Sequence, residues 1–122
     1  MSDAKKWEDE LNGMIASGQG FPAGFDKYYA DDVVMVEGNG DSTRGKEANR
    51  QRELQFLSSV AEFHGAKMLA SAAHGDVGFS EWEFDATFKD GKRRVLREIA
   101  RRRWKDGKVV DERFYYDMQS MG

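Results

Sequence analysis

One carboxylate stands where a protein could use it as a general base. Glu37 directly follows the β-branched run Val33–Val36 and precedes the turn Gly38–Asp41. At the end of a strand, apolar neighbours would raise the pKa of this carboxyl toward neutrality, which a general base requires. The alternative is a strand-end glutamate in solvent. Glu37 is therefore a candidate catalytic residue.

Arg97 is a second candidate, because its predicted position is at odds with its charge. In the register described below, Arg97 lies on the apolar face of a sheet between Phe84 and Tyr116. A guanidinium there must be paired or line a wet cavity, since an unpaired buried charge is costly. A pocket arginine, a structural ion pair and a bulge that turns Arg97 outward are the three alternatives.

The other polar residues of the predicted sheet give less specific signals. Ser80, Arg101 and Glu112 form a second polar row near its rim, where a solvated sheet end explains them about as well. The only histidines, His64 and His74, flank a predicted strand, and ten residues of extended chain separate them by about 33 Å. A metal site shared by both is therefore not expected.

Composition argues against several classes of function. The chain has no cysteine, which excludes disulfides, thiolate nucleophiles and cysteine-ligated zinc, and it lacks the motifs of nucleotide and dinucleotide enzymes. We therefore expect neither a cofactor nor a metal. The net charge of −3 argues against nucleic acid as a partner, although arginines crowd residues 93–103. No apolar run resembles a signal sequence or could span a membrane, so a cytoplasmic location is the default expectation.

These residues would be positioned by a single α+β domain over residues 1–122. Apolar residues at spacings of three and four predict a helix over Ser2–Ile15 and a longer amphipathic helix over Gly45–Glu62. A short helix is expected over Phe21–Tyr29, beginning near the proline. The run Val33–Val36 predicts a strand that ends at the Gly38–Asp41 turn.

From residue 64 onward the apolar period changes to two, which indicates strands. We predict strands over Lys67–Ala73, Val77–Lys89, Lys92–Lys105 and Lys108–Met118. Asp-Gly pairs separate the last three strands, and such a pair is a strong signal for a two-residue hairpin turn. The last three strands therefore form an antiparallel meander packed on the N-terminal helices.

Two-residue turns would fix which residues share a face. Trp82, Ile99 and Phe114 then form one row on the inner face, beside the row that contains Arg97. A third row joins Ala86, Val95 and Met118. The opposite face would carry Glu81, Glu83, Asp85, Glu98, Arg102, Arg113, Tyr115 and Asp117.

Three strings resemble the SnoaL-like branch of the nuclear transport factor two superfamily, which includes polyketide cyclases and ketosteroid isomerases. They are Tyr28-Tyr29-Ala30-Asp31-Asp32-Val33-Val34-Met35-Val36-Glu37, Thr43-Arg44-Gly45-Lys46-Glu47-Ala48, and Trp104–Val109 continuing to Arg113–Asp117. The resemblance covers nearly the whole chain. It implies a cystatin-like cone in which a curved antiparallel sheet wraps the N-terminal helices around a pocket for a hydrophobic molecule, commonly in a homodimer formed through the sheet.

The resemblance also suggests roles for particular residues. Glu37 falls where ketosteroid isomerases carry their carboxylate base, and Asp117 falls near the acid–base aspartate of the cyclases. The predicted register places Asp117 on the outer face unless a bulge turns it inward. The oxyanion-binding tyrosine and aspartate of the isomerases have no counterpart here, so Tyr29, Arg97 or Tyr116 would supply other donors. The Arg-x-Asp string of the related epoxide hydrolases is missing.

The leading hypothesis is therefore an enzyme that isomerises, cyclises or dehydrates an apolar carbonyl compound by proton transfer. Glu37 would take the proton, Arg97 and Tyr116 would stabilise the enolate, and Asp117 would return a proton. Tyr29, Trp82, Phe84, Ile99 and Phe114 would line the substrate pocket. The alternative is a non-catalytic binding or dimerisation module that uses the same cone.

Overall fold

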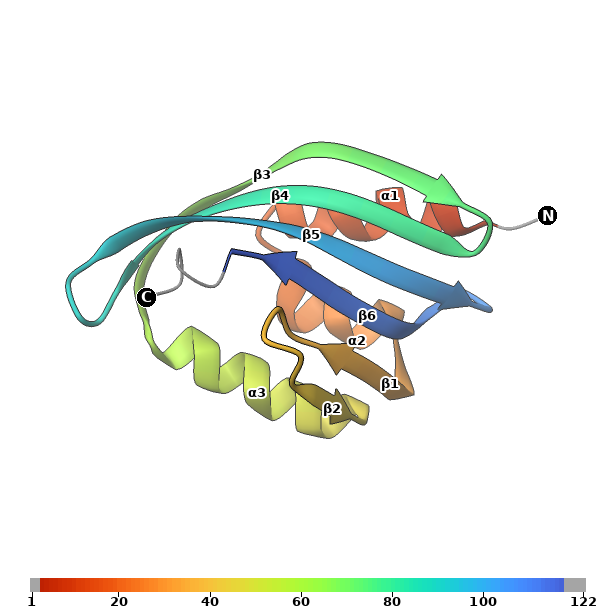
Figure 1. Cartoon of the computed structure of the whole chain (residues 1–122), viewed down its shortest axis with the longest axis horizontal. Helices are drawn as coiled ribbons and strands as arrows, with labels where there is room; N and C mark the ends of the chain where they lie inside the picture. Colours follow the sequence, from red (N-terminus) through yellow and green to blue (C-terminus); the bar gives the residue numbers. More distant parts are fainter. Residues whose placement is uncertain (1–2, 118–122) are drawn as a thin grey trace.

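The computed structural model describes residues 3–117, which form helices packed on one mixed β-sheet (Figure 1). The strands lie in the order β2-β1-β6-β5-β4-β3. The elements, in chain order, are α1 (Ala4–Ala16), the π-helical turn η1 (Gly20–Gly24), α2 (Phe25–Tyr28), β1 (Tyr29–Val36), β2 (Ser42–Arg44), α3 (Lys46–Ser58), β3 (Val60–His74), β4 (Val77–Phe88), β5 (Arg93–Lys105) and β6 (Lys108–Tyr116).

The fold is the α+β cone that the sequence predicts. Strands β3, β4 and β5 are long and curved, and they arch over α1, while α3 lies beside β1 and β2 (Figure 1). The sheet is not wholly antiparallel as expected, because β1 pairs in parallel with β6. Parallel neighbours need a long connection, which the chain from β2 to β5 provides. None of the helices in the described part of the chain is long and apolar enough to cross a membrane.

The β4–β5 hairpin differs from the predicted two-residue turn. Phe88 N donates to Lys92 O at 2.9 Å, and Gly91 adopts φ +87°, so the loop has three residues with glycine in the left-handed position. The extra residue shifts the register by one, so that Glu83 rather than Phe84 pairs with Arg97. Because side chains alternate, this shift turns the whole of β5 over. The predicted facing of Arg97 and Ile99 is therefore wrong.

The β5–β6 hairpin has the predicted two-residue turn, with Asp106 at φ 51° and Gly107 at φ 78°. A bulge follows, because Trp104 pairs with Val109 whereas Arg103 pairs with Asp111. This second one-residue shift offsets the first, so β6 faces as predicted. The inner face carries Trp82, Phe84, Leu96, Glu98, Ala100, Arg102, Trp104, Glu112, Phe114 and Tyr116. The predicted row of Ala86, Val95 and Met118 is wrong for the first two, because Ala86 is buried opposite Arg94 whereas Val95 is exposed, and Met118 lies outside the described residues.

The apolar core lies between α1, α2 and the sheet. Trp104 is at its centre, with its ring 5.9 Å from that of Trp7 and 5.8 Å from that of Tyr28. The other buried members of the core are Ala4, Leu11, Phe25, Tyr29, Val33, Met35 and Val109. Burying side chains of this size contributes about 1.5–3 kcal/mol each, which holds the narrow end of the cone closed.

Helix α3 departs from the expected amphipathic packing. Leu54 and Leu57 are exposed, and the buried residue of the helix is Asn49. Its side-chain Nδ2 donates to Thr43 O at 3.0 Å and to Gly45 O at 2.8 Å. The Asn49 side chain therefore joins the start of the helix to β2. It ends at Ser58, and the chain turns into β3 at Val60, earlier than the strand that alternation predicts.

Candidate active site

A buried ion network lies between α1 and strands β5 and β6. The Arg102 side chain is 3% exposed, and its Nε donates to Glu112 Oε2 at 2.6 Å. Its Nη1 donates to Glu8 Oε2 at 2.7 Å and to Asn12 Oδ1 at 3.1 Å. Burial lowers the pKa of Arg102, but the surrounding Tyr29, Glu112 and Glu8 raise it by more, so the net shift is upward. Arg102 therefore joins α1 to β5 and β6.

Further hydrogen bonds complete this network. Trp104 Nε1 donates to Glu8 Oε1 at 2.8 Å, Ser80 Oγ donates to Glu8 Oε2, and Tyr29 OH donates to Glu112 Oε2 at 2.6 Å. Burial, then the charge of Glu112, raise the pKa of Tyr29 well above its ordinary value, so the phenol keeps its proton. Burial also raises the pKa of Glu112, against the lowering effect of Arg102 and Tyr29. These hydrogen bonds fix the orientation of the buried side chains.

A second group of carboxyls faces the middle of the cone. Glu98 lies in a cross-strand row between Trp82 on β4 and Tyr116 on β6, and Glu53 reaches in from α3. Burial, and then the charges of Glu112 and Glu37, raise the pKa of Glu98 to about 8. The same causes raise the pKa of Glu53 to about 7. Both carboxyls can therefore hold a proton near neutral pH.

Glu37 is held in a different environment at the edge of the same group. Arg52 Nη2 lies 2.6 Å from Glu37 Oε1, and Tyr116 OH donates to Glu37 Oε2 at 3.2 Å. Both contacts fix the orientation of the Glu37 carboxyl group. Burial and the Glu37 charge raise the pKa of Tyr116, so its hydroxyl remains a donor. Gly38 permits this approach, because a Cβ there would lie 2.8 Å from the Tyr116 ring.

Aromatic residues form the wall beside Glu98. The rings of Trp82 and Phe84 stack with centroids 5.6 Å apart and an interplanar angle of 11°. Trp82 is 1% exposed, and its Nε1 has no hydrogen-bond partner among residues 3–117. Phe114, on β6, packs against the apolar core. The wall is therefore apolar except for the buried Trp82 Nε1, which is an unpaired donor among the described residues.

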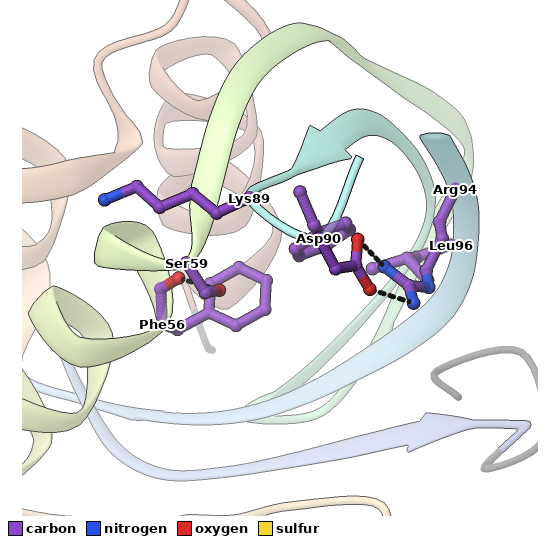
Figure 2. A pocket seen from close by; sticks show the side chains of 7 residues that line it. Phe56, Ser59, Lys89, Asp90, Arg94 and Leu96 are labelled. Carbon is purple, nitrogen blue, oxygen red and sulfur yellow. Dashed lines mark hydrogen bonds and ion pairs between the residues drawn. The ribbon is translucent and has the colours of Figure 1, made fainter. Parts of the chain in front are cut away.

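An open cleft of about 370 Å³ lies beside the β4–β5 hairpin (Figure 2). It separates the end of α3 from the β4–β5 hairpin, and its floor includes Leu96, two residues from Glu98 on the same face of β5. Figure 2 shows Arg94 paired with Asp90 on one side, at 2.9 Å, and Phe56 and Ser59 on the other. Phe88 and Lys89 complete the lining. Leu96 is therefore shared between the lining of the cleft and the strand that carries Glu98.

The structure gathers most of the predicted site residues and separates others. Six of them lie on the inner side of the cone, namely Tyr29, Glu37, Trp82, Phe84, Phe114 and Tyr116. Arg97 lies on the outer face with a side chain that is 73% exposed, where its Nε donates to Glu83 at 2.9 Å. Ile99 is 40% exposed on the same outer face. Asp117 is exposed just beyond β6, and its acid–base role stays a prediction.

Sequence reasoning missed the inner carboxyls and their arginine. The predicted register placed Glu98 and Arg102 on the outer face, whereas Arg102, rather than Arg101, is the cross-strand partner of Glu112. Glu53 lies within the helix predicted over Gly45–Glu62, where its sequence position does not distinguish it from the other charged residues. Glycine after Lys89-Asp90 is the one sequence signal that allows the observed three-residue turn, but it equally allows the two-residue turn.

Comparison with known proteins identifies the family. The model of the SnoaL-like domain matches residues 12–112. A candidate SnoaL-like polyketide cyclase from Mesorhizobium loti is 31% identical, with a TM-score of 0.83 and coverage of 95% of this chain and 100% of that one. No curated protein matches.

Two more distant structures share the fold. A Xanthomonas campestris protein of unknown function with a cystatin-like fold is 18% identical, with a TM-score of 0.84 and coverage of 98% and 95%. A Catenulispora acidiphila protein with a ketosteroid isomerase-like fold, in complex with trimethylamine, is 15% identical, with a TM-score of 0.76 and coverage of 90% and 86%. With the family model matching most of its length, this chain belongs to the SnoaL-like domain family.

Proposed function

We propose that this protein binds a small, mainly apolar carbonyl compound inside the cone and moves a proton at the carbon next to the carbonyl, without a cofactor. One observation supports this most strongly. Two carboxyls of one interior experience opposite environments, because Glu37 contacts a guanidinium while burial raises the pKa of Glu98 to about 8. Carboxyls that differ in this way can act as base and acid at the same pH.

In the proposed reaction Glu37 removes the proton from carbon. Arg52 and the hydroxyl of Tyr116 hold the Glu37 carboxylate in place. Glu98, still protonated at neutral pH, donates a hydrogen bond to the carbonyl oxygen as negative charge develops on it. A neutral carboxylic acid with a raised pKa serves this purpose in ketosteroid isomerase. Trp82 and Phe84 pack against the apolar part of the substrate.

The test uses 2-tetralone, an apolar ketone with exchangeable α-protons. Proton NMR in D₂O should show that the wild-type protein accelerates exchange of these protons. Glu37→Gln should lose about 10²–10⁴-fold of that rate, the contribution of a positioned base. Glu83→Gln, which changes an outer-face glutamate, is the matched control and should keep the rate. Exchange that proceeds equally fast in Glu37→Gln would remove Glu37 from the mechanism.

The non-catalytic alternative uses the same interior. The open cleft beside Leu96 and the aromatic wall would suit a binding module as well as an enzyme. It predicts that 2-tetralone binds, measured by quenching of tryptophan fluorescence, while its α-protons exchange at the uncatalysed rate.

The outer face of the sheet supports a further proposal, that two copies pair through it. Apolar side chains are exposed on this face at Phe79, Val95, Ile99 and Tyr115. They lie on three neighbouring strands and alternate with the exposed ion pair of Arg97 and Glu83. A grouped apolar surface with polar residues around it is typical of a protein interface. The proposed assembly is a homodimer with both cones open to solvent.

A further inference from the structure

Carboxyl groups outnumber guanidinium groups inside the cone. Arg102 contacts two of the carboxyls, Glu8 and Glu112, and Arg52 contacts Glu37. Within residues 3–117, Glu53 and Glu98 make no hydrogen bond or ion pair. The titratable and charged groups facing this interior are Glu8 of α1, Tyr29 of β1, Glu37 after β1, Arg52 and Glu53 of α3, Arg94, Glu98 and Arg102 of β5, and Glu112 and Tyr116 of β6, with Arg94 paired to Asp90 of the β4–β5 loop.

Two buried atoms of the same interior lack partners. Glu112 is 0% exposed, and its Oε1 accepts no hydrogen bond in the described chain, although its Oε2 is fully engaged. Trp82 Nε1 is the unpaired donor described above. Leaving a buried polar atom unpaired costs about 1–3 kcal/mol. A ligand that carries a donor for Glu112 and an acceptor for Trp82 would satisfy both.

The places of these atoms indicate how such a ligand would lie. Glu112 is close enough to Glu53 and Glu98 that its charge raises the pKa of each. Trp82 is the direct cross-strand neighbour of Glu98. A donor at Glu112 is therefore also near Glu53, while an acceptor at Trp82 is also near Glu98. The ring of Phe84, stacked on Trp82, adds an aromatic surface for the apolar part of the ligand at the end where Glu98 lies.

We propose that the substrate is an amine that also carries a carbonyl group, with its ammonium against Glu53 and Glu112 and its carbonyl oxygen at Trp82 Nε1 and Glu98. The carbonyl placement rests on the proposed function, whereas the ammonium site does not. A compact cation would balance the surplus of carboxylates. It would also reverse the pKa shift of Glu53, because a neighbouring positive charge favours the ionised form. Binding should therefore release a proton near pH 7.

The experiment compares two ligands with one skeleton, 2-aminotetralin and 2-tetralol. Isothermal titration calorimetry of the wild-type protein should show the amine binding at least about 10-fold more tightly at pH 7, which corresponds to about 1.4 kcal/mol. The same titration in two buffers of different ionisation enthalpy should show proton release with the amine alone. The ratio of the affinities for the amine and the alcohol should increase from pH 6 to pH 8, because Glu53 ionises in this range.

Glu53→Gln tests the assigned site, and Glu47→Gln is its control, because Glu47 lies on the same helix with a side chain that is 73% exposed. The amine preference should disappear in Glu53→Gln and persist in Glu47→Gln. Equal affinity of the wild-type protein for amine and alcohol, including no detectable binding of either at millimolar concentration, would overturn the inference. So would a preference that survives in Glu53→Gln.

This outcome is separable from the proposed reaction. If the protein prefers the amine but does not accelerate exchange of the α-protons of 2-tetralone, the proposed reaction is rejected and the ammonium site is retained. Exchange that depends on Glu37, together with equal affinity for amine and alcohol, would retain the enzyme and reject the ammonium site.

Discussion

Replacing Arg102 with methionine tests whether the buried ion network holds the cone together. Methionine fills much of the volume of the arginine side chain but supplies no charge. The change leaves Glu8 and Glu112, both 0% exposed, without a counter-charge. Removing one partner of a buried ion pair costs about 3–5 kcal/mol, because the remaining charge is neither solvated nor paired.

The loss should be measured by urea unfolding and by a thermal scan. For a domain of 122 residues, 3–5 kcal/mol corresponds to a fall in Tm of roughly 10–20 °C. The natural pKa of Glu112 is already raised by burial, so protonation should recover part of the lost stability as the pH is lowered toward 5. A smaller deficit at pH 5 than at pH 8 would identify the unpaired carboxylates as the cause.

Arg97→Met is the matched control, because it makes the same substitution on the same strand. The Arg97 side chain is 73% exposed and pairs with Glu83 on the outer face, and exposed pairs contribute about 0–1 kcal/mol. Equal losses in the two variants, or a loss below about 1 kcal/mol for Arg102→Met, would refute the argument from burial and with it the inward facing of Arg102.

Further predictions concern pH, backbone conformation and assembly. Because burial raises the folded-state pKa of Glu98 to about 8, the native state keeps a proton that the unfolded chain releases. The free energy of unfolding should therefore fall as the pH rises from about 5 to 8. Urea titrations of Glu98→Gln should show a smaller fall. Gly91→Ala should lower the free energy of unfolding by about 1–2 kcal/mol, because Gly91 adopts φ +87°. Gly13→Ala, at a helical position with open space around it, should raise the free energy of unfolding by about 0.5–1 kcal/mol. Both changes are measured from the urea midpoint. Ile99→Arg should shift the sedimentation coefficient to that of a monomer if the outer face forms a dimer, and an unchanged coefficient would place the interface elsewhere.

The architecture was predictable because several local signals agree. Alternation from residue 77 onward, the Asp106-Gly107 turn and the run Val33–Val36 each indicate strands, and the structure has them. The short strand Ser42–Arg44 and the parallel pairing of β1 with β6 were not predicted. Three residues carry little periodicity, and parallel pairing depends on contacts between segments far apart in the chain.

The facing of β5 was not predictable, because apolar residues occur on both of its sides. Leu96 and Ala100 face inward, whereas Val95 and Ile99 face outward, so the hydrophobic pattern favours neither orientation. Arginines are likewise divided between the two faces. Because the hydrophobic pattern does not distinguish the two faces, the length of the β4–β5 loop determines which one faces inward. An Asp-Gly pair is compatible with loops of two and of three residues. The site residues of β6 were placed correctly only because the later bulge cancels this shift.

The three-residue loop at the tip of β4 has a consequence for how this chain can vary. Surface hairpins ordinarily tolerate the gain or loss of a residue. Here the deletion of Lys89 would turn β5 over. Arg97 and Ile99 would then face the interior in place of Glu98 and Arg102. The length of this exposed loop therefore determines which β5 side chains face the interior. We expect the loop length to be as constrained as the identity of a catalytic side chain.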